Sequence, residues 1–324
     1  MPSRGEIEIF SSPEAEVEQP TGIIADDDGG IWFTSMGNDR LGRVDPPTGR
    51  VETFADPADH VRQPANVYPD PDGRIWFTSL GSDRVGRIDP RAASPYEMIE
   101  TFTAAGMSEP VAIKLAADGM IWFSLRGADA IARIDPVASD PQGSIELFRG
   151  PAVKAPAAIF PAADLWLWWV NSGDRSIARL DPEAHDPAAT IETVLGAPPI
   201  GEARAWAADA AGRIWLTMRD PDALLRIDPL AADPAATAFL VSSPLLRQPD
   251  GIWSGEDGGI WFANTGADQI ARVDPEAEDP AATIETFGGP PEVDAPFDIK
   301  AGPDGWLWFT NQRGNSIALI YAGE

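Results

Sequence analysis

A single motif, an isoleucine or leucine followed by tryptophan, stands at seven evenly spaced places along the chain and constrains its fold more than any other feature. The repeated tryptophans are Trp32, Trp76, Trp122, Trp168, Trp215, Trp261 and Trp308. Successive copies are 44 to 47 residues apart and together account for nearly all of the 324 residues. A fixed period of this length is the signature of a repeat architecture, in which each copy forms one supersecondary unit. The chain is therefore expected to fold as seven copies of one unit.

Each unit contains four short segments of alternating polarity, separated by turns rich in Asp, Gly and Pro. This pattern is typical of β-hairpins. In the sixth unit the four strands are expected at 249–253, 260–263, 270–274 and 283–287. A four-stranded unit of this length in seven copies is typical of a propeller. The sequence thus predicts an all-β fold, a seven-bladed β-propeller with antiparallel four-stranded blades.

The two ends of the chain complement each other. The last unit ends after its third strand, at 316–320, and lacks a fourth. Residues 6–10, Glu-Ile-Glu-Ile-Phe, copy the fourth strand of the sixth unit at 284–287. A blade assembled from both termini covers a strand edge that would otherwise be exposed. We therefore expect one domain over residues 1–324, with a seventh blade formed by about 296–320 and 6–10.

Composition excludes several classes of partner. The chain has a formal charge of −27 and no cysteine. Phosphate binding needs a concentrated basic face, so nucleic acid is not expected as a partner, and anionic membranes are disfavoured. Without cysteine there is no disulfide and no thiolate site. No apolar signal segment and no bilayer-length apolar run are present. We expect a cytoplasmic monomer whose partner is a small molecule.

The repeat also predicts where a binding site lies. In a propeller the first strand of each blade begins, and the second ends, at the same mouth of the central channel. Each blade places two residues there, one directly after the proline that opens the first strand and one four places after the repeated tryptophan. A pocket at this mouth would be concave and built from several blades. The first set is Thr21, Ala65, Val111, Ala157, Arg204, Asp250 and Phe297, with Ala203 in place of the proline before Arg204, and the second is Met36, Leu80, Arg126, Ser172, Arg219, Thr265 and Gln312.

Three arginines stand out in these sets because the chain is so acidic. They flank blade 4, which contributes only the small residues Ala157 and Ser172. Small residues between guanidinium groups suit a carboxylate, a phosphate or a polarised carbonyl. The alternative is that each arginine pairs with a local acid and points to solvent. The ligand-binding residues expected on this basis are Arg126, Arg204, Arg219, Ser172, Gln312 and Trp253, with Trp206 as a second candidate wall.

The repeat units carry a resemblance to a known family. Residues 29–34 with 41–44, and 72–78 with 85–88, resemble the repeat of the streptogramin B lyase (virginiamycin B lyase) family. The resemblance covers all seven units. It implies a lyase activity, in which an elimination at the ester linkage opens a cyclic depsipeptide antibiotic with the help of a magnesium ion. It also implies histidines directly after the first-strand proline and a glutamate four places after the tryptophan.

This chain departs from the family at those positions, where it has neither histidine nor glutamate. Because elimination needs a positioned general base, the family activity is not carried over. The replacement candidates are Asp250 and His60, which lies between blades 1 and 2 on the face of the channel mouth. The alternative for His60 is a solvated loop position. His185 is expected on the surface of the opposite face.

Oxygen-bearing side chains in blades 6 and 7 offer a second kind of site. Asp250, Asp298 and Asn311 could bind a hard cation such as Mg²⁺ or Ca²⁺. The alternative is that they end their strands through turn hydrogen bonds. Three functions are then compatible with the chain: an enzyme on a cyclic ester (a lyase or a metal-assisted lactone hydrolase), a non-catalytic binder of an anionic metabolite, and a protein-binding platform. Whether the protein is an enzyme stays open at the level of sequence.

Overall fold

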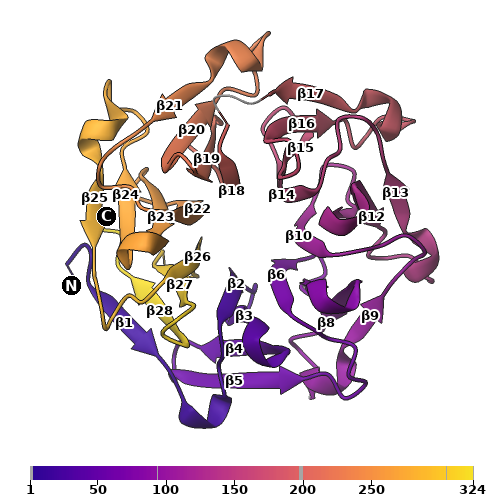
Figure 1. The fold of residues 1–324 in the computed structure, drawn as a ribbon. Helices are drawn as coiled ribbons and strands as arrows, with labels where there is room; N and C mark the ends of the chain where they lie inside the picture. The colour runs from indigo at the N-terminus through magenta and orange to yellow at the C-terminus, as the bar shows by residue number, and fades with distance from the viewer. Residues whose placement is uncertain (1–2, 93, 197–199, 304, 324) are drawn as a thin grey trace.

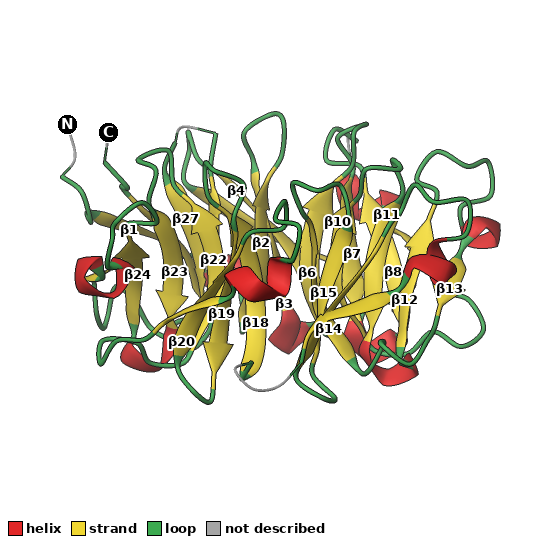
Figure 2. Cartoon of the chain, turned by 90° about the horizontal axis from the view of Figure 1, so that it is seen from above, coloured by secondary structure: helices red, strands yellow, loops and turns green. Residues whose placement is uncertain are grey.

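The computed structural model describes residues 3–92, 94–196, 200–303 and 305–323. Residues 1, 2 and 324, at the ends of the predicted domain, therefore lie outside the described part. Seven four-stranded antiparallel sheets stand in a ring around a central channel (Figure 1). Seen from the side, the sheets form a flat disc (Figure 2). The predicted seven-bladed all-β propeller is confirmed.

The strands of every blade follow one another from the channel outward. The inner strands are β2 (Pro20–Ala25), β6 (Pro64–Pro69), β10 (Pro110–Leu115), β14 (Pro156–Pro161), β18 (Glu202–Ala208), β22 (Pro249–Ser254) and β26 (Pro296–Ala301). The second strands are β3 (Ile31–Ser35), β7 (Ile75–Ser79), β11 (Ile121–Leu125), β15 (Leu167–Asn171), β19 (Ile214–Arg219), β23 (Ile260–Asn264) and β27 (Leu307–Asn311). The third strands are β4 (Arg40–Asp45), β8 (Arg84–Ile88), β12 (Ala130–Ile134), β16 (Ser176–Leu180), β20 (Ala223–Ile227), β24 (Gln269–Val273) and β28 (Ser316–Ile320). The outer strands are β5 (Arg50–Ala55), β9 (Glu100–Phe102), β13 (Glu146–Phe148), β17 (Glu192–Leu195), β21 (Phe239–Val241), β25 (Glu285–Phe287) and β1 (Ile7–Phe10).

The seven repeated tryptophans are buried in the interior of the blades. In blade 3 the Trp122 indole donates to Asp118 at 3.0 Å, and its ring stacks on Phe148 with centroids 5.0 Å apart. Arg133 covers the same indole at 5.4 Å and pairs with Asp118 at 3.2 Å and with Glu146 at 2.7 Å. The tryptophan thereby joins the second, third and outer strands of its blade, which explains why it recurs once per unit.

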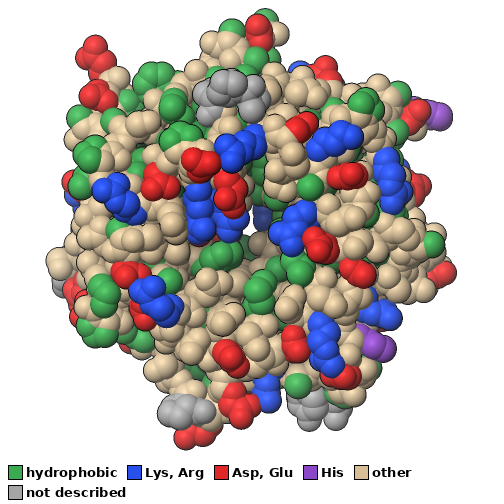
Figure 3. Space-filling view, viewed as in Figure 1, with side chains coloured by type: hydrophobic (Ala, Val, Ile, Leu, Met, Phe, Trp, Pro, Cys, Tyr) green, Lys and Arg blue, Asp and Glu red, His purple; other side chains and the backbone are tan. Residues whose placement is uncertain are grey.

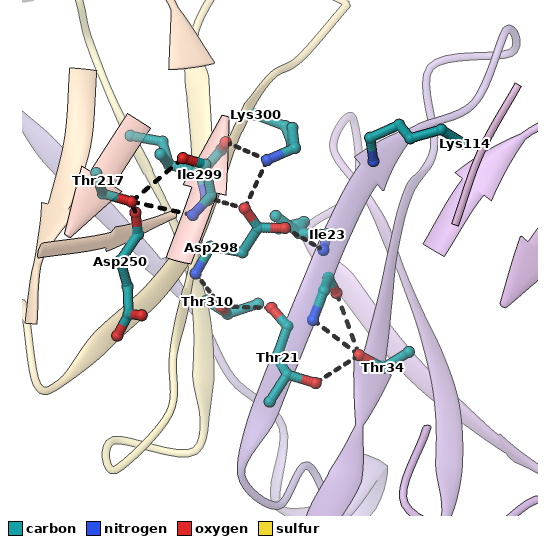
Figure 4. Close-up of polar contacts among 12 residues, drawn as sticks. Thr21, Ile23, Thr34, Lys114, Thr217, Asp250, Asp298, Ile299, Lys300 and Thr310 are labelled. Atoms are coloured by element: carbon teal, nitrogen blue, oxygen red, sulfur yellow. Dashed lines mark hydrogen bonds and ion pairs between the residues drawn. The ribbon is translucent and has the colours of Figure 1, made fainter. Parts of the chain in front are cut away.

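Hydroxyl groups join neighbouring blades around the channel. The inner strands carry a bulge near their start, and in blade 5 this leaves the Ala205 N–H to donate to Thr217 Oγ1 at 3.1 Å. The Thr217 hydroxyl donates in turn to the Asp250 carbonyl of blade 6 at 2.6 Å. Thr310 makes the same connection from blade 7 to the Thr21 carbonyl at 2.8 Å (Figure 4). Each such bond fixes the position of one inner strand relative to the next.

The ring closes through both chain ends. β1 pairs with β28 in antiparallel register, with Phe10 opposite Ile317. The Phe10 ring lies 4.8 Å from that of Trp308. The two termini lie on the same side of the disc in both ribbon views (Figures 1 and 2). The predicted completion of the last blade by the N-terminal strand is confirmed.

Helical structure in the described residues is limited to 3₁₀ segments of three or four residues. One of them, η5 (Arg126–Ala128), ends at Asp129, which has a positive φ of 48°. The Asp129 side chain accepts a hydrogen bond from the Ala155 N–H of the next blade at 2.6 Å. In the part of the chain that the structure describes, no helix is both long and apolar enough to cross a membrane.

Candidate functional site

The inner strands enclose a cavity of about 260 Å³ in the central channel, and all seven blades contribute to its wall. The strand register explains the position, because Pro249 pairs with Asn264 and each inner strand begins where its second strand ends. Basic side chains gather around the central opening, with acidic ones beside them (Figure 3). The charged residues of the described wall are Lys114, Arg126, Arg204, Lys300, Asp250 and Asp298. Four cationic side chains therefore face two carboxylates.

Asp250 joins two of the three predicted arginines. Its side chain is 3% exposed, and its Oδ1 accepts a hydrogen bond from Arg204 Nε at 2.6 Å. Its Oδ2 accepts a second bond from Arg219 and lies 3.2 Å from the Thr265 hydroxyl. Burial opposes the charge of Arg204, but Asp250 and Glu202 outweigh it and the pKa of this guanidinium is raised. Both Asp250 oxygens therefore accept a hydrogen bond from an arginine, and the two ion pairs anchor this carboxylate in the wall.

Arg126 lines the same cavity but has a separate partner. Its Nε donates to Glu109 at 2.9 Å, and the two side chains are 41% and 45% exposed. An ion pair this exposed contributes little to stability, so Arg126 can exchange its partner for a ligand. Arg204 and Arg126 thus share one cavity, whereas Arg219 is not part of the described wall and reaches it through Asp250. Both alternatives considered from the sequence therefore apply: Arg126 and Arg204 line one pocket, and each of them also forms an ion pair with an acid.

The remaining predicted ligand-binding residues divide into two groups. Trp253 and Trp206 lie in the wall of the cavity. Ser172 is exposed, and its hydroxyl donates to the Ala155 carbonyl at 2.7 Å. Gln312 donates its main-chain N–H to the Ala295 carbonyl at 3.0 Å. Neither Ser172 nor Gln312 is part of the described wall.

Asp298 lies in the cavity wall and is paired with a lysine of its own strand. Its Oδ1 accepts a hydrogen bond from Lys300 Nζ at 2.5 Å, and its Oδ2 lies 3.3 Å from the Ile23 N–H of blade 1 (Figure 4). The Asp250 carboxylate points away from this pair, so the two acids do not converge on one point (Figure 4).

Asn311, the third candidate metal ligand, fills a structural position of the repeat. Its Oδ1 accepts the Asp294 N–H at 3.1 Å, and its Nδ2 donates to the Glu292 carbonyl at 3.0 Å. Asn264 makes the same two kinds of bond in blade 6. Asn311 is not in the described wall, and no group of three or more acidic or histidine side chains among the described residues could hold a metal ion. The residues present do not fit the magnesium ion that the family resemblance implies.

A second ring of inner-strand residues recurs from blade to blade, and of the members named below only Trp253 was among the sequence-predicted site residues. These residues stand four places after the opening proline and pair with the repeated tryptophan of their blade. Their signal was present in the repeat, three residues further along each inner strand than the mouth positions. They include Tyr68, Lys114, Phe160, Trp253 and Lys300.

Lys114 has the most perturbed ionisation in this ring. Its Nζ donates to the Ile113 carbonyl at 3.1 Å and lies 4.6 Å from the centroid of the Tyr68 ring. Burial and the positive charge of Lys300 lower the pKa of Lys114 to about 7, although Asp298 acts in the opposite direction. About half of the Lys114 amines are therefore neutral at pH 7.

His60, the second candidate base, lies outside the cavity. His60 is exposed, and its main-chain N–H donates to the Asp56 side chain at 2.7 Å. The Nδ1 of its imidazole ring lies 3.5 Å from the hydroxyl of Thr101 on β9. β9 is the outermost strand of blade 2, so the connection that carries His60 passes along the rim of the disc. His185 is also exposed, as expected.

Comparisons with known proteins agree with the propeller fold. The sequence model of the virginiamycin B lyase family matches residues 1–217. A structure of streptogramin B lyase superposes with a TM-score of 0.81 at 22% identity, covering 98% of this chain and 97% of that chain. Virginiamycin B lyase from Staphylococcus aureus gives a TM-score of 0.80 at 20% identity, with 97% and 99% covered.

More distant propellers match as well. The aldose sugar dehydrogenase of Streptomyces coelicolor, in a form with bound PQQ, gives a TM-score of 0.56 at 16% identity, and the match covers 98% of this chain and 99% of that chain. At such identities the structural likeness shows the fold alone. No curated protein sequence matches the chain.

Proposed function

Since the chain belongs to the virginiamycin B lyase family, we propose that its channel binds a small aromatic or apolar molecule that carries an anionic group. The composition of the cavity wall carries this proposal. Phe160, Trp206 and Trp253 supply apolar faces, and Arg126 and Arg204 supply guanidinium groups. Aromatic walls with a few polar anchors are typical of small-molecule sites, and the planar guanidinium matches a carboxylate.

The charges of the wall support an anion in preference to a cation. Arg204 shares its charge with the buried Asp250, whereas Arg126 is balanced only by the half-exposed Glu109. Replacing an exposed partner costs little, and an ion pair inside the cavity is stronger than one in water. Arg126 is therefore the expected anchor of the anionic group.

Binding is supported better than the family's elimination. His60 lies at the rim, and Asp250, although it is in the cavity wall, is bound by two arginines, so no unpartnered base of the kind that the elimination needs is among these two candidates. The metal-assisted alternative would need Asp250, Asp298 and Asn311 to converge, and they do not. The protein-binding alternative has no comparable support, because the polar and aromatic groups converge inside the channel.

The test uses a matched pair of probes, 2-naphthoate and the neutral 2-naphthamide, titrated by isothermal calorimetry and by quenching of tryptophan fluorescence. We expect the carboxylate to bind more tightly than the amide. Arg126→Ala should weaken naphthoate binding by about 10- to 100-fold, the effect of losing a charge-assisted hydrogen bond. Arg126 is preferred to Arg204 for this variant because its removal leaves only the exposed Glu109 without a partner.

Arg175→Ala is the control. Arg175 forms a comparable exposed ion pair with Asp220 at 3.1 Å but does not belong to the described cavity wall. Its replacement should leave both affinities unchanged. Equal binding of the two probes, or equal loss in the Arg126 and Arg175 variants, would overturn the proposal.

A further inference from the structure

Lys114 presents an amine to the cavity without a carboxylate of its own. It lies in the wall, and among the described residues no acid forms an ion pair with it. The groups facing it are Tyr68 of β6, whose own pKa is raised by burial, and Lys300 with Asp298 of β26. The neighbouring strands β11 and β14 contribute no titratable side chain.

The two lysines of the cavity differ in their partners. Lys300 Nζ is bound to Asp298 at 2.5 Å and to the Ile299 carbonyl at 2.9 Å, and lies 5.1 Å from the centroid of the Trp253 ring. Its charge is thereby held in place facing the Lys114 amine (Figure 4). The Lys114 amine contacts a carbonyl and an aromatic ring. A desolvated lysine next to a second cation is an activated nucleophile toward carbonyl compounds.

We infer that Lys114 is a covalent binding site for an aldehyde or ketone, which it captures as an imine in the channel. The inference deepens the proposed function and rests on it, because the same cavity holds the remainder of the ligand. In the step, Lys114 Nζ forms a bond to the carbonyl carbon. The carbonyl oxygen leaves as water with the two amine hydrogens, so no oxidant or reductant is required. Arg126 and the aromatic wall would hold a carbonyl compound that also bears a carboxylate.

The chain permits a sharp test because it contains only three lysines, Lys114, Lys154 and Lys300. The full protein is incubated at pH 7 with 4-formylbenzoate and cyanoborohydride, which reduces an imine to a stable amine. Peptide mass spectrometry then reports labelling at each lysine and at the N-terminal amine. Lys154 is exposed and serves as the internal control. We expect Lys114 to be labelled about tenfold faster than Lys154 or more, since its neutral fraction at pH 7 is far larger.

Two variants distinguish a reactive Lys114 amine from a lysine with a purely structural role. Lys114→Arg keeps a basic side chain in the wall that cannot form an imine, and it should abolish the fast label, whereas Arg175→Ala, outside the described wall, should leave the label unchanged. Lys300→Met removes the neighbouring charge and frees Asp298, and both changes raise the pKa of Lys114. The pH profile of Lys114 labelling should then move to higher pH, an effect that a purely structural role would not produce.

The outcomes distinguish this inference from the proposed function. If Lys114 is labelled no faster than Lys154, or if its profile does not move in Lys300→Met, the covalent site is refuted even where 2-naphthoate binds. If Lys114 is labelled fast but 4-formylbenzoate has no advantage over benzaldehyde and 2-naphthoate does not bind, the amine is reactive and the anion site is refuted.

Discussion

Replacing Lys114 by methionine should make the protein more stable at neutral pH. The pKa of Lys114 falls from an ordinary 10.5 to about 7 in the folded chain, mainly through burial. Between these two values the unfolded chain binds the proton and the folded chain does not, so stability rises with pH in this window. The destabilisation is complete below pH 7 and absent above pH 10.5. Methionine fills a similar volume without a charge to bury.

The magnitude follows from the pKa values. Each pKa unit corresponds to about 1.4 kcal/mol, so the full destabilisation by Lys114 is about 5 kcal/mol below pH 7. Between pH 7 and pH 9 the excess of protons bound by the unfolded state at this residue grows from about one half to nearly one. The free energy of unfolding of the natural protein should therefore rise by roughly 2 kcal/mol relative to the variant.

The assay is urea unfolding of both proteins at several values between pH 6.5 and pH 9.5, followed by tryptophan fluorescence. Taking the difference between the two proteins at each pH removes the contributions of the other ionisable groups. Lys154→Met, at an exposed position, is the control and should show a constant difference. A constant difference in Lys114→Met as well would show that the amine keeps an ordinary pKa, and the reasoning would fail.

Two further predictions concern the ring and the family reaction. Deletion of residues 1–11 removes β1 and the Phe10–Trp308 contact, so we expect aggregation or a loss of several degrees in Tm. A soluble truncated protein with an unchanged Tm would contradict the closure of the ring by the N-terminal strand. Incubation with a streptogramin B antibiotic should give no ring-opened product by mass spectrometry, because histidine and glutamate are missing from the positions at which the family resemblance implies them. Turnover comparable to that of a family enzyme would show that the catalytic site lies elsewhere.

The fold was predictable because its determinants are local and repeated. The tryptophan at one position per unit, the turn residues and the copied fourth strand each appear in a short stretch of chain. A propeller blade contacts mainly its neighbours, so seven similar units leave few other arrangements. The mouth positions could also be enumerated, because strand register fixes which residue follows the proline or the tryptophan.

The roles of those mouth residues could not be read in the same way. Arg204 and Asp250 are 46 positions apart and Arg219 and Asp250 are 31 apart, and only the ring brings them into one ion pair network. The role of Asn311 also became visible only in the structure. Its side-chain amide forms hydrogen bonds with the main chain near Asp294 and Glu292, so it has a structural role at the position where a metal ligand was considered.

Sequence by itself therefore determined the architecture and the closure of the ring. Tertiary structure alone decided which of the mouth residues share a cavity, and it made Lys114 an unusual amine. The pKa of Lys114 depends on burial and on the charge of Lys300 across the channel, in a blade from the other end of the chain. Electrostatic environments of this kind arise from groups distant in sequence, and no local pattern encodes them.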